Sequence, residues 1–139
     1  MLHQPKVLLI SNGEAESNLL EQVLRKHAAL HSVRDLAELE HLLDGVAFEV
    51  VFCGWTFDGG TWIDALGKVQ QCNPDLPVVI FSRSGGEREW VEVLEAGAFD
   101  LFNAPYGLPD IRAVLEQAID SYEARRSRKA ALPIRIMAS

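Results

Sequence analysis

Five short runs of apolar residues alternate along the chain with segments whose apolar residues recur at helical spacing. The runs, at 6–10, 30–33, 48–55, 77–81 and 98–102, are typical of strands buried on both faces. Helices are predicted at 16–27, 36–43, 61–69, 87–96 and about 110–122. This alternation predicts a parallel five-stranded sheet with right-handed crossovers and helices on both faces, so the fold class is an α/β three-layer sandwich of five βα units.

Capping residues separate the predicted elements. Asp35 with Glu38, and Thr61 with Asp64, form capping-box patterns at the starts of the second and third helices. Gly97 is expected to end the fourth helix.

Two further expectations concern the segments around these caps. The stretch 56–60 is predicted to be a loop, because it is polar and rich in glycine. In the fourth helix, Trp90, Val93 and Leu94 are expected to face the core.

The composition is that of an ordinary globular domain, with 139 residues of which 48% are hydrophobic and 24% charged. Its apolar runs are shorter than a membrane span, and its first residues lack the pattern of a secretory signal. We therefore expect a cytoplasmic protein with no membrane association. Cys53 and Cys72 provide neither a disulfide framework nor a metal-binding spacing.

Charge divides the chain into two parts. Residues 1–124 contain eight of the thirteen basic residues and all twenty acidic ones, a net charge of −12, which argues against nucleic acid binding by this part. We assign 1–124 to one domain and 125–139 to a basic C-terminal extension, disordered or forming an arm. Its positive side chains can extend the last helix and stabilise its end, contact nucleic acid, or lead into a partner.

The third strand ends at Gly54, and this position is the most informative one in the sequence. In open α/β sheets the functional groups lie at the carboxyl ends of the strands. Here those ends carry Gly54, Ser11 and Asn12 after the first strand, and Ser82 after the fourth. Because none of these residues is a carboxylate, the edge of the sheet offers no ligand set for Mg²⁺.

Three short segments in the second half of the chain resemble those of a known protein family. Pro77–Ser82, Glu95–Ala98 and Asn103–Tyr106, in this order and spacing, resemble the receiver domain of two-component response regulators. The resemblance extends from Lys6 to about Tyr122. It implies a flavodoxin-like sheet with strand order 2-1-3-4-5.

The resemblance also implies where a phosphorylation site would lie. The family's acidic pair falls on Ser11 and Asn12, its phosphoacceptor aspartate on Gly54, its hydroxyl on Ser82 and its lysine on Ala104. Of these positions only Ser82 carries the family's residue type. The carboxylates and the lysine are lost together, so none of the five positions carries a charged side chain.

Phosphoryl transfer needs an oxygen nucleophile and positive charge around the transferred group. Gly54 provides no nucleophile, and the expected metal and lysine have no counterpart. The sequence therefore predicts a protein that is not an enzyme and has no metal or cofactor. We interpret it as a non-phosphorylatable, receiver-like protein-interaction module in two-component, phosphorelay-type signal transduction.

Two alternatives stay open at this point. The crevice beside Ser11, Gly54 and Ser82 can bind a small ligand, or the chain is an active receiver phosphorylated at Asp58. Against the second alternative, a single carboxylate before two glycines is typical of a turn. Trp55 and Trp62 flank the same loop, and ordinary packing is the simplest interpretation of both.

The resemblance implies that partners bind the face formed by the fourth helix, the fifth strand and the last helix. On this chain the residues of that face are Val91, Glu95, Leu101, Asn103 and Tyr106. Leu101 stands where the family often has an aromatic switch residue. The expected partner is another signalling protein or a second copy of the chain.

Overall fold

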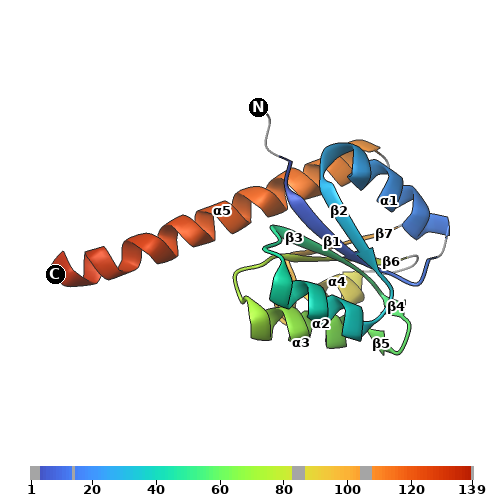
Figure 1. Cartoon of the computed structure of the whole chain (residues 1–139), viewed down its shortest axis with the longest axis horizontal. Helices are drawn as coiled ribbons and strands as arrows, with labels where there is room; N and C mark the ends of the chain where they lie inside the picture. The colour runs from blue at the N-terminus through green and yellow to red at the C-terminus, as the bar shows by residue number, and fades with distance from the viewer. Residues whose placement is uncertain (1–3, 14, 83–86, 104–107, 139) are drawn as a thin grey trace.

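Five parallel strands form the central sheet, and their order along it is β2-β1-β3-β6-β7. The computed structural model describes residues 4–13, 15–82, 87–103 and 108–138. The strands are β1 (Lys6–Ile10), β2 (Ala29–Val33), β3 (Val50–Gly54), β6 (Val78–Ser82) and β7 (Asp100–Asn103). The helices are α1 (Ala15–His27), α2 (Leu36–Gly45), α3 (Trp62–Cys72), α4 (Glu87–Glu95) and α5 (Leu108–Ala138). The predicted fold class and strand order are thus confirmed (Figure 1).

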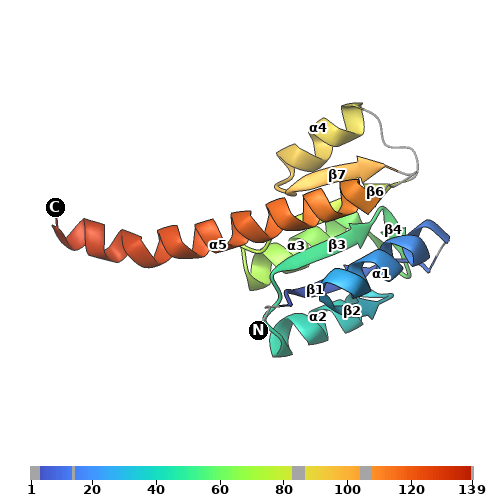
Figure 2. The same ribbon diagram turned by 90° about the horizontal axis from the view of Figure 1, so that it is seen from above.

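Two apolar layers pack on the two faces of the sheet, and the alternation along each strand separates them. In β3, Phe52 packs with residues of α1 and α5, whereas Val51 and Cys53 pack with residues of α2, α3 and α4. The views in Figures 1 and 2 show the helices on the same two sides. Since the five residues of β3 are all buried, the strand at the centre of the sheet is covered on both faces, as its apolar run predicts.

The expected loop at 56–60 contains a small hairpin, so this prediction was wrong. Strands β4 (Thr56–Phe57) and β5 (Gly60–Thr61) pair antiparallel, with Asp58 and Gly59 at the turn. An Asp-Gly pair favours such tight turns, and the sequence therefore contained a signal for it.

The predicted helix caps are present. Asp35 precedes α2, and its Oδ1 accepts a hydrogen bond of 2.9 Å from the backbone N–H of Glu38. Thr61 precedes α3 in a capping box, and its N–H donates to Asp64 Oδ2 at 3.0 Å. These bonds satisfy backbone groups that have no partner inside the helix.

Helix α4 ends at a glycine, as predicted. Gly97 has a φ of 107°, its N–H donates to Leu94 O at 3.1 Å, and the N–H of Ala98 donates to Val93 O at 3.2 Å. This pair of bonds is the Schellman arrangement, which needs a residue with positive φ. The end of the Gln70 side chain also lies against Gly97, so a methyl group there would require this side chain to shift.

We expect Gly97→Ala to lower the free energy of unfolding by about 1–3 kcal/mol, because alanine is strained at this φ and meets Gln70. The matched control is Gly67→Ala inside α3, where an added Cβ has no neighbour within 4 Å. The control should stabilise the protein by about 0.5–1 kcal/mol, since alanine is the better helix former. Urea denaturation of both variants measures the difference, and equal effects would contradict this account.

The apolar face of α4 is narrower than expected. Val93 is fully buried and Leu94 half-buried, but Trp90 is 44% exposed, so its predicted inward position was wrong. The Trp90 indole N–H donates to Asp100 Oδ1 of β7 at 3.3 Å. A tryptophan needs a partner for this N–H, and here the partner lies at the rim of the sheet.

Helix α5 continues beyond the sheet through the basic segment (Figures 1 and 2). Tyr122 is its last buried residue among those described, and its hydroxyl accepts a 3.3 Å hydrogen bond from Asn73. The Arg126 guanidinium lies 5.6 Å from the centre of the Tyr122 ring, within cation–π range. Arg125 donates to Asp75 O at 3.5 Å. These two arginines therefore contact the domain itself.

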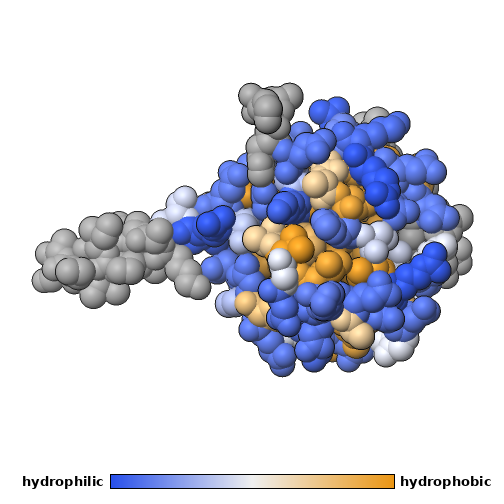
Figure 3. Space-filling model, in the orientation of Figure 1, coloured by the Kyte–Doolittle hydropathy of each residue, from blue (hydrophilic) through white to orange (hydrophobic). Residues whose placement is uncertain are grey.

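Figure 3 shows the side of the molecule on which the edge strand β2 lies in front. Apolar side chains gather there between α1 and α2, surrounded by hydrophilic ones. Leu30 of β2 is partly buried and packs against the apolar layer that contains residues of α1 and α5. Within the described part of the chain, no helix combines the length and the apolar character needed to cross a membrane.

Candidate functional site

The carboxyl ends of β1, β3 and β6 bring Ser11, Gly54 and Ser82 to one edge of the sheet. Ile10 pairs with Cys53 and Gly54 pairs with Phe81, so Ser11 follows the first pair and Ser82 follows the second. Ser82 in turn pairs with Asn103 of β7. The sequence prediction that these positions converge is therefore confirmed for the strands.

Gly54 faces the side of the sheet that α1 and α5 cover, as do Phe52 two residues earlier and its pairing partner Phe81. A Cβ at position 54 would lie 3.4 Å from Phe81 Cζ and 3.5 Å from Thr56 O, which is ordinary van der Waals contact. The φ of Gly54 is not positive. A side chain is therefore sterically tolerable at this position, and the fold itself does not demand glycine.

Ser11 and Ser82 are the two buried polar residues of the described chain, 5% and 9% exposed. The Ser11 N–H donates to Val33 O at 3.2 Å, which ties the end of β1 to β2. Asn12 beside it is half-buried. Ala104, the fifth position of the predicted set, lies outside the described residues. Where side chains are described, no three His, Cys, Asp or Glu groups gather closely enough to hold a metal ion.

An arginine lies beside the turn that follows β1, and the sequence analysis missed it. Gly13 has a φ of 82°, and a Cβ there would be 3.1 Å from Arg34 Cζ and Nη2. The guanidinium therefore packs over Gly13, one residue after Asn12. A fixed positive charge at this place repels a divalent cation. Arg34 follows β2 directly, so its position after a neighbouring strand was the available signal.

Asp58, the alternative phosphoacceptor, lies at the tip of the β4–β5 hairpin with an exposed side chain. Its N–H donates to Arg34 O at 3.1 Å, and Asp58 forms an isolated bridge with Asp35. The backbone of Asp58 thus fastens the hairpin to the β2–α2 connection. This is the turn role that the sequence favoured.

The two tryptophans that flank the β4–β5 hairpin, Trp55 and Trp62, pack against each other. Their ring centres are 5.5 Å apart, and the backbone N–H of Trp62 donates a hydrogen bond to the backbone O of Trp55 at 3.1 Å. Trp62 is 3% exposed and belongs to the core layer under α2, α3 and α4, while Trp55 is half-buried against it. Ordinary packing, the simplest interpretation of the sequence, is confirmed for both.

Cys53 is fully buried beside Gly54, and its Sγ donates to Gly54 O at 3.3 Å. Burial raises the pKa of the Cys53 thiol well above its usual range, which suppresses the reactive thiolate. Cys72 is exposed.

We expect iodoacetamide to label the native protein once, at Cys72, and the unfolded protein twice. Mass spectrometry of the two samples measures this, and native labelling at Cys53 would contradict the position of β3.

The predicted interaction face is only partly at the surface. Val91 is 42% exposed and Glu95 is exposed, but Leu101 is 5% exposed, so its assignment to a contact surface was wrong. Leu101 pairs with Ile80 and points into the core layer under α4, because its strand alternates between the two faces. Of Asn103 only the backbone is described, at the end of β7, and Tyr106 lies outside the described residues.

The comparisons with known proteins agree with this architecture. No family model matches the chain. It is 26% identical over 119 residues to the response regulator protein PilR of Pseudomonas aeruginosa, a match that covers 85% of this chain and 27% of that protein. The chain spans about a quarter to less than half the length of the curated relatives that it matches.

Solved receiver domains have the same fold. The signal receiver domain of an HD domain-containing protein from Pseudomonas fluorescens superposes with a TM-score of 0.81 at 18% identity, over 92% of this chain and 96% of that one. The beryllofluoride-activated NtrC4 receiver domain dimer superposes with a TM-score of 0.76 at 18% identity, over 84% and 98%. The chain therefore folds as a response regulator receiver (CheY-like) domain.

Proposed function

We propose that this receiver domain acts in two-component signalling without being phosphorylated, as a protein-interaction module. The observation that carries the proposal is Gly54, which provides no nucleophile at the end of β3. Ser11 and Asn12 provide no carboxylate, and Arg34 adds a positive charge beside them. Phosphorylation would not switch such a domain between two states, so its partner surface is available at all times.

Incubation of the native protein with acetyl phosphate and Mg²⁺ tests this proposal. We expect intact-mass spectrometry to show no added phosphoryl group, because neither a nucleophile nor a metal site is in place. A receiver domain that is phosphorylated under the same conditions serves as the positive control. A stable phosphoryl group on Asp58 or on any residue near Gly54 would overturn the proposal.

The surface that we propose for the partner is formed by α4 and β7. It combines the two exposed apolar side chains of α4, Trp90 and Val91, with the acidic Glu95. Exposed aromatic residues next to charged ones are typical of interface anchors. The beryllofluoride-activated NtrC4 receiver domain forms a dimer, which supports a second copy of the chain as one occupant of this surface.

We expect Val91→Glu to weaken association through this surface at least about tenfold, because it places a charge in the apolar contact. Ile63→Glu is the matched control, since Ile63 is 58% exposed and belongs to a different helix, α3. Sedimentation velocity over a range of concentrations measures self-association of both variants. If the wild-type chain is monomeric, a pull-down from the native host compares the same pair. Equal weakening by both substitutions would refute this choice of surface.

A further inference from the structure

A hollow of about 200 Å³ lies between α1 and α5, on the sheet face opposite to α2, α3 and α4. It is lined by Pro5, His27, Arg112, Leu115, Glu116 and Ile119. Pro5 precedes β1 and His27 ends α1, so the hollow is at the amino-terminal end of β1. It is therefore remote from the edge of the sheet that carries Gly54.

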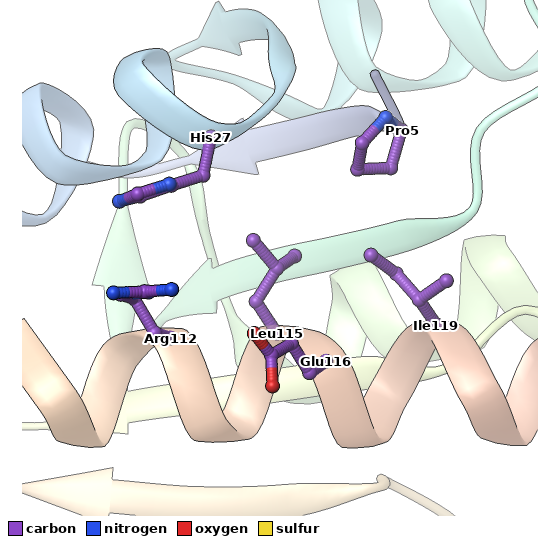
Figure 4. Close-up of a pocket in the computed structure, with 6 residues that line it drawn as sticks. All are labelled: Pro5, His27, Arg112, Leu115, Glu116 and Ile119. Carbon is purple, nitrogen blue, oxygen red and sulfur yellow. The ribbon is translucent and has the colours of Figure 1, made fainter. Parts of the chain in front are cut away.

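The lining of the hollow divides into an apolar wall and a basic side. Leu115 is 4% exposed, Pro5 is buried and Ile119 is half-buried, and these three side chains form the wall. Figure 4 shows Leu115 and Ile119 pointing from α5 into the space below Pro5. Binding of an apolar group against this wall would remove apolar surface from water, which is favourable.

On the basic side, His27 of α1 and Arg112 of α5 face each other across the hollow (Figure 4). In the same view the Glu116 carboxylate lies close to α5 beside Leu115, and not between His27 and Arg112. Two nitrogen-bearing side chains thus converge in a domain whose residues 1–124 have a net charge of −12. The planar guanidinium can donate two parallel hydrogen bonds to one carboxylate, and the imidazole can donate a third.

We propose that this hollow binds a small monocarboxylic acid with a compact apolar body, about the size of benzoate. The carboxylate would lie on Arg112 and His27, and the apolar body on Leu115 and Ile119. Pockets that bind drug-sized ligands have volumes of roughly 300–1,000 Å³, and benzene fits an engineered cavity of about 150 Å³. A hollow of about 200 Å³ therefore suits a ligand only slightly larger than benzene. The proposal does not depend on the phosphorylation state of the domain.

Titration of the ¹⁵N-labelled full chain with benzoate, followed by NMR, tests the proposal. We expect saturable shifts of the amides around His27 and Leu115, with a dissociation constant on the order of 1 mM, given the few atoms of the ligand. Benzyl alcohol, which has a similar shape and no charge, should bind at least about tenfold more weakly.

Substitutions on the basic side of the hollow test whether its side chains bind the carboxylate of the ligand. Arg112→Gln should raise the dissociation constant for benzoate about tenfold or more, because the bidentate donor is lost. Arg88→Gln, at another exposed arginine on α4, is the matched control and should leave it unchanged. His27→Gln provides a second variant if Arg112→Gln alters the fold. Shifts that do not saturate, equal binding of benzyl alcohol, or unchanged binding in both pocket variants would overturn the proposal.

Discussion

The fourfold variant Ser11→Asp, Asn12→Asp, Gly54→Asp, Ala104→Lys should accept a phosphoryl group from acetyl phosphate in the presence of Mg²⁺, whereas the native chain should not. The substitutions supply two metal-binding carboxylates, an oxygen nucleophile and a positive charge for the phosphoryl oxygens. The backbone already places positions 11 and 54 at one edge of the sheet. A Cβ at position 54 would be in ordinary contact with Phe81 and Thr56 O, so the new side chain is tolerable.

The single variant Gly54→Asp is the control for this prediction. It has a nucleophile but neither the metal ligands nor the lysine, and each missing electrostatic group costs on the order of 10²-fold in rate. We therefore expect its phosphorylation to be at least about 10²-fold slower than that of the fourfold variant. Intact-mass spectrometry with and without EDTA measures both. If Gly54→Asp alone were phosphorylated as fast, the absence of the acidic pair and the lysine would not be a reason to expect an inactive native site.

The strands and helices were predictable from the sequence because their determinants are local, whereas the strand order came from the resemblance to receiver domains. The apolar runs at β1, β3 and β6 are continuous, and a strand buried on both faces needs such a run. Gly97 indicated the end of α4, because the residue that follows a helix in this way needs a positive φ, which glycine adopts easily. The edge position of Ser11, Gly54 and Ser82 follows from the parallel sheet alone, since all its strands end on the same side.

The surface was less predictable because exposure depends on neighbours that are distant in sequence. Trp90 has helical spacing with Val93, but the polar partner of its indole is Asp100 in β7. Arg34 packs over Gly13 because β1 and β2 are neighbours in the sheet, so its place could be inferred from the predicted strand order but not from a local pattern. For Leu101 the error was avoidable, since the alternation that buries Ile80 also buries its pairing partner.

Trp62→Ala should lower the free energy of unfolding by about 3–5 kcal/mol, because it empties a large volume in the core layer under α2, α3 and α4. Trp62 is 3% exposed and its ring centre is 5.5 Å from that of Trp55, so the substitution also removes this contact between the two rings. Domains of ordinary stability unfold with about 5–15 kcal/mol, and the loss is therefore a large fraction of the total. The melting temperature should fall by roughly 10–17 °C.

Trp90→Ala is the matched control, with the same chemical change at a side chain that is 44% exposed. It removes one hydrogen bond to Asp100 at the surface and should cost no more than about 1 kcal/mol. Association through the α4–β7 surface should instead weaken at least about tenfold, since an exposed tryptophan is a typical anchor. Urea denaturation and sedimentation velocity of both variants measure the two effects. If Trp90→Ala destabilised the fold as much as Trp62→Ala, then Trp90 would belong to the core, and the proposed partner surface would lose its anchor.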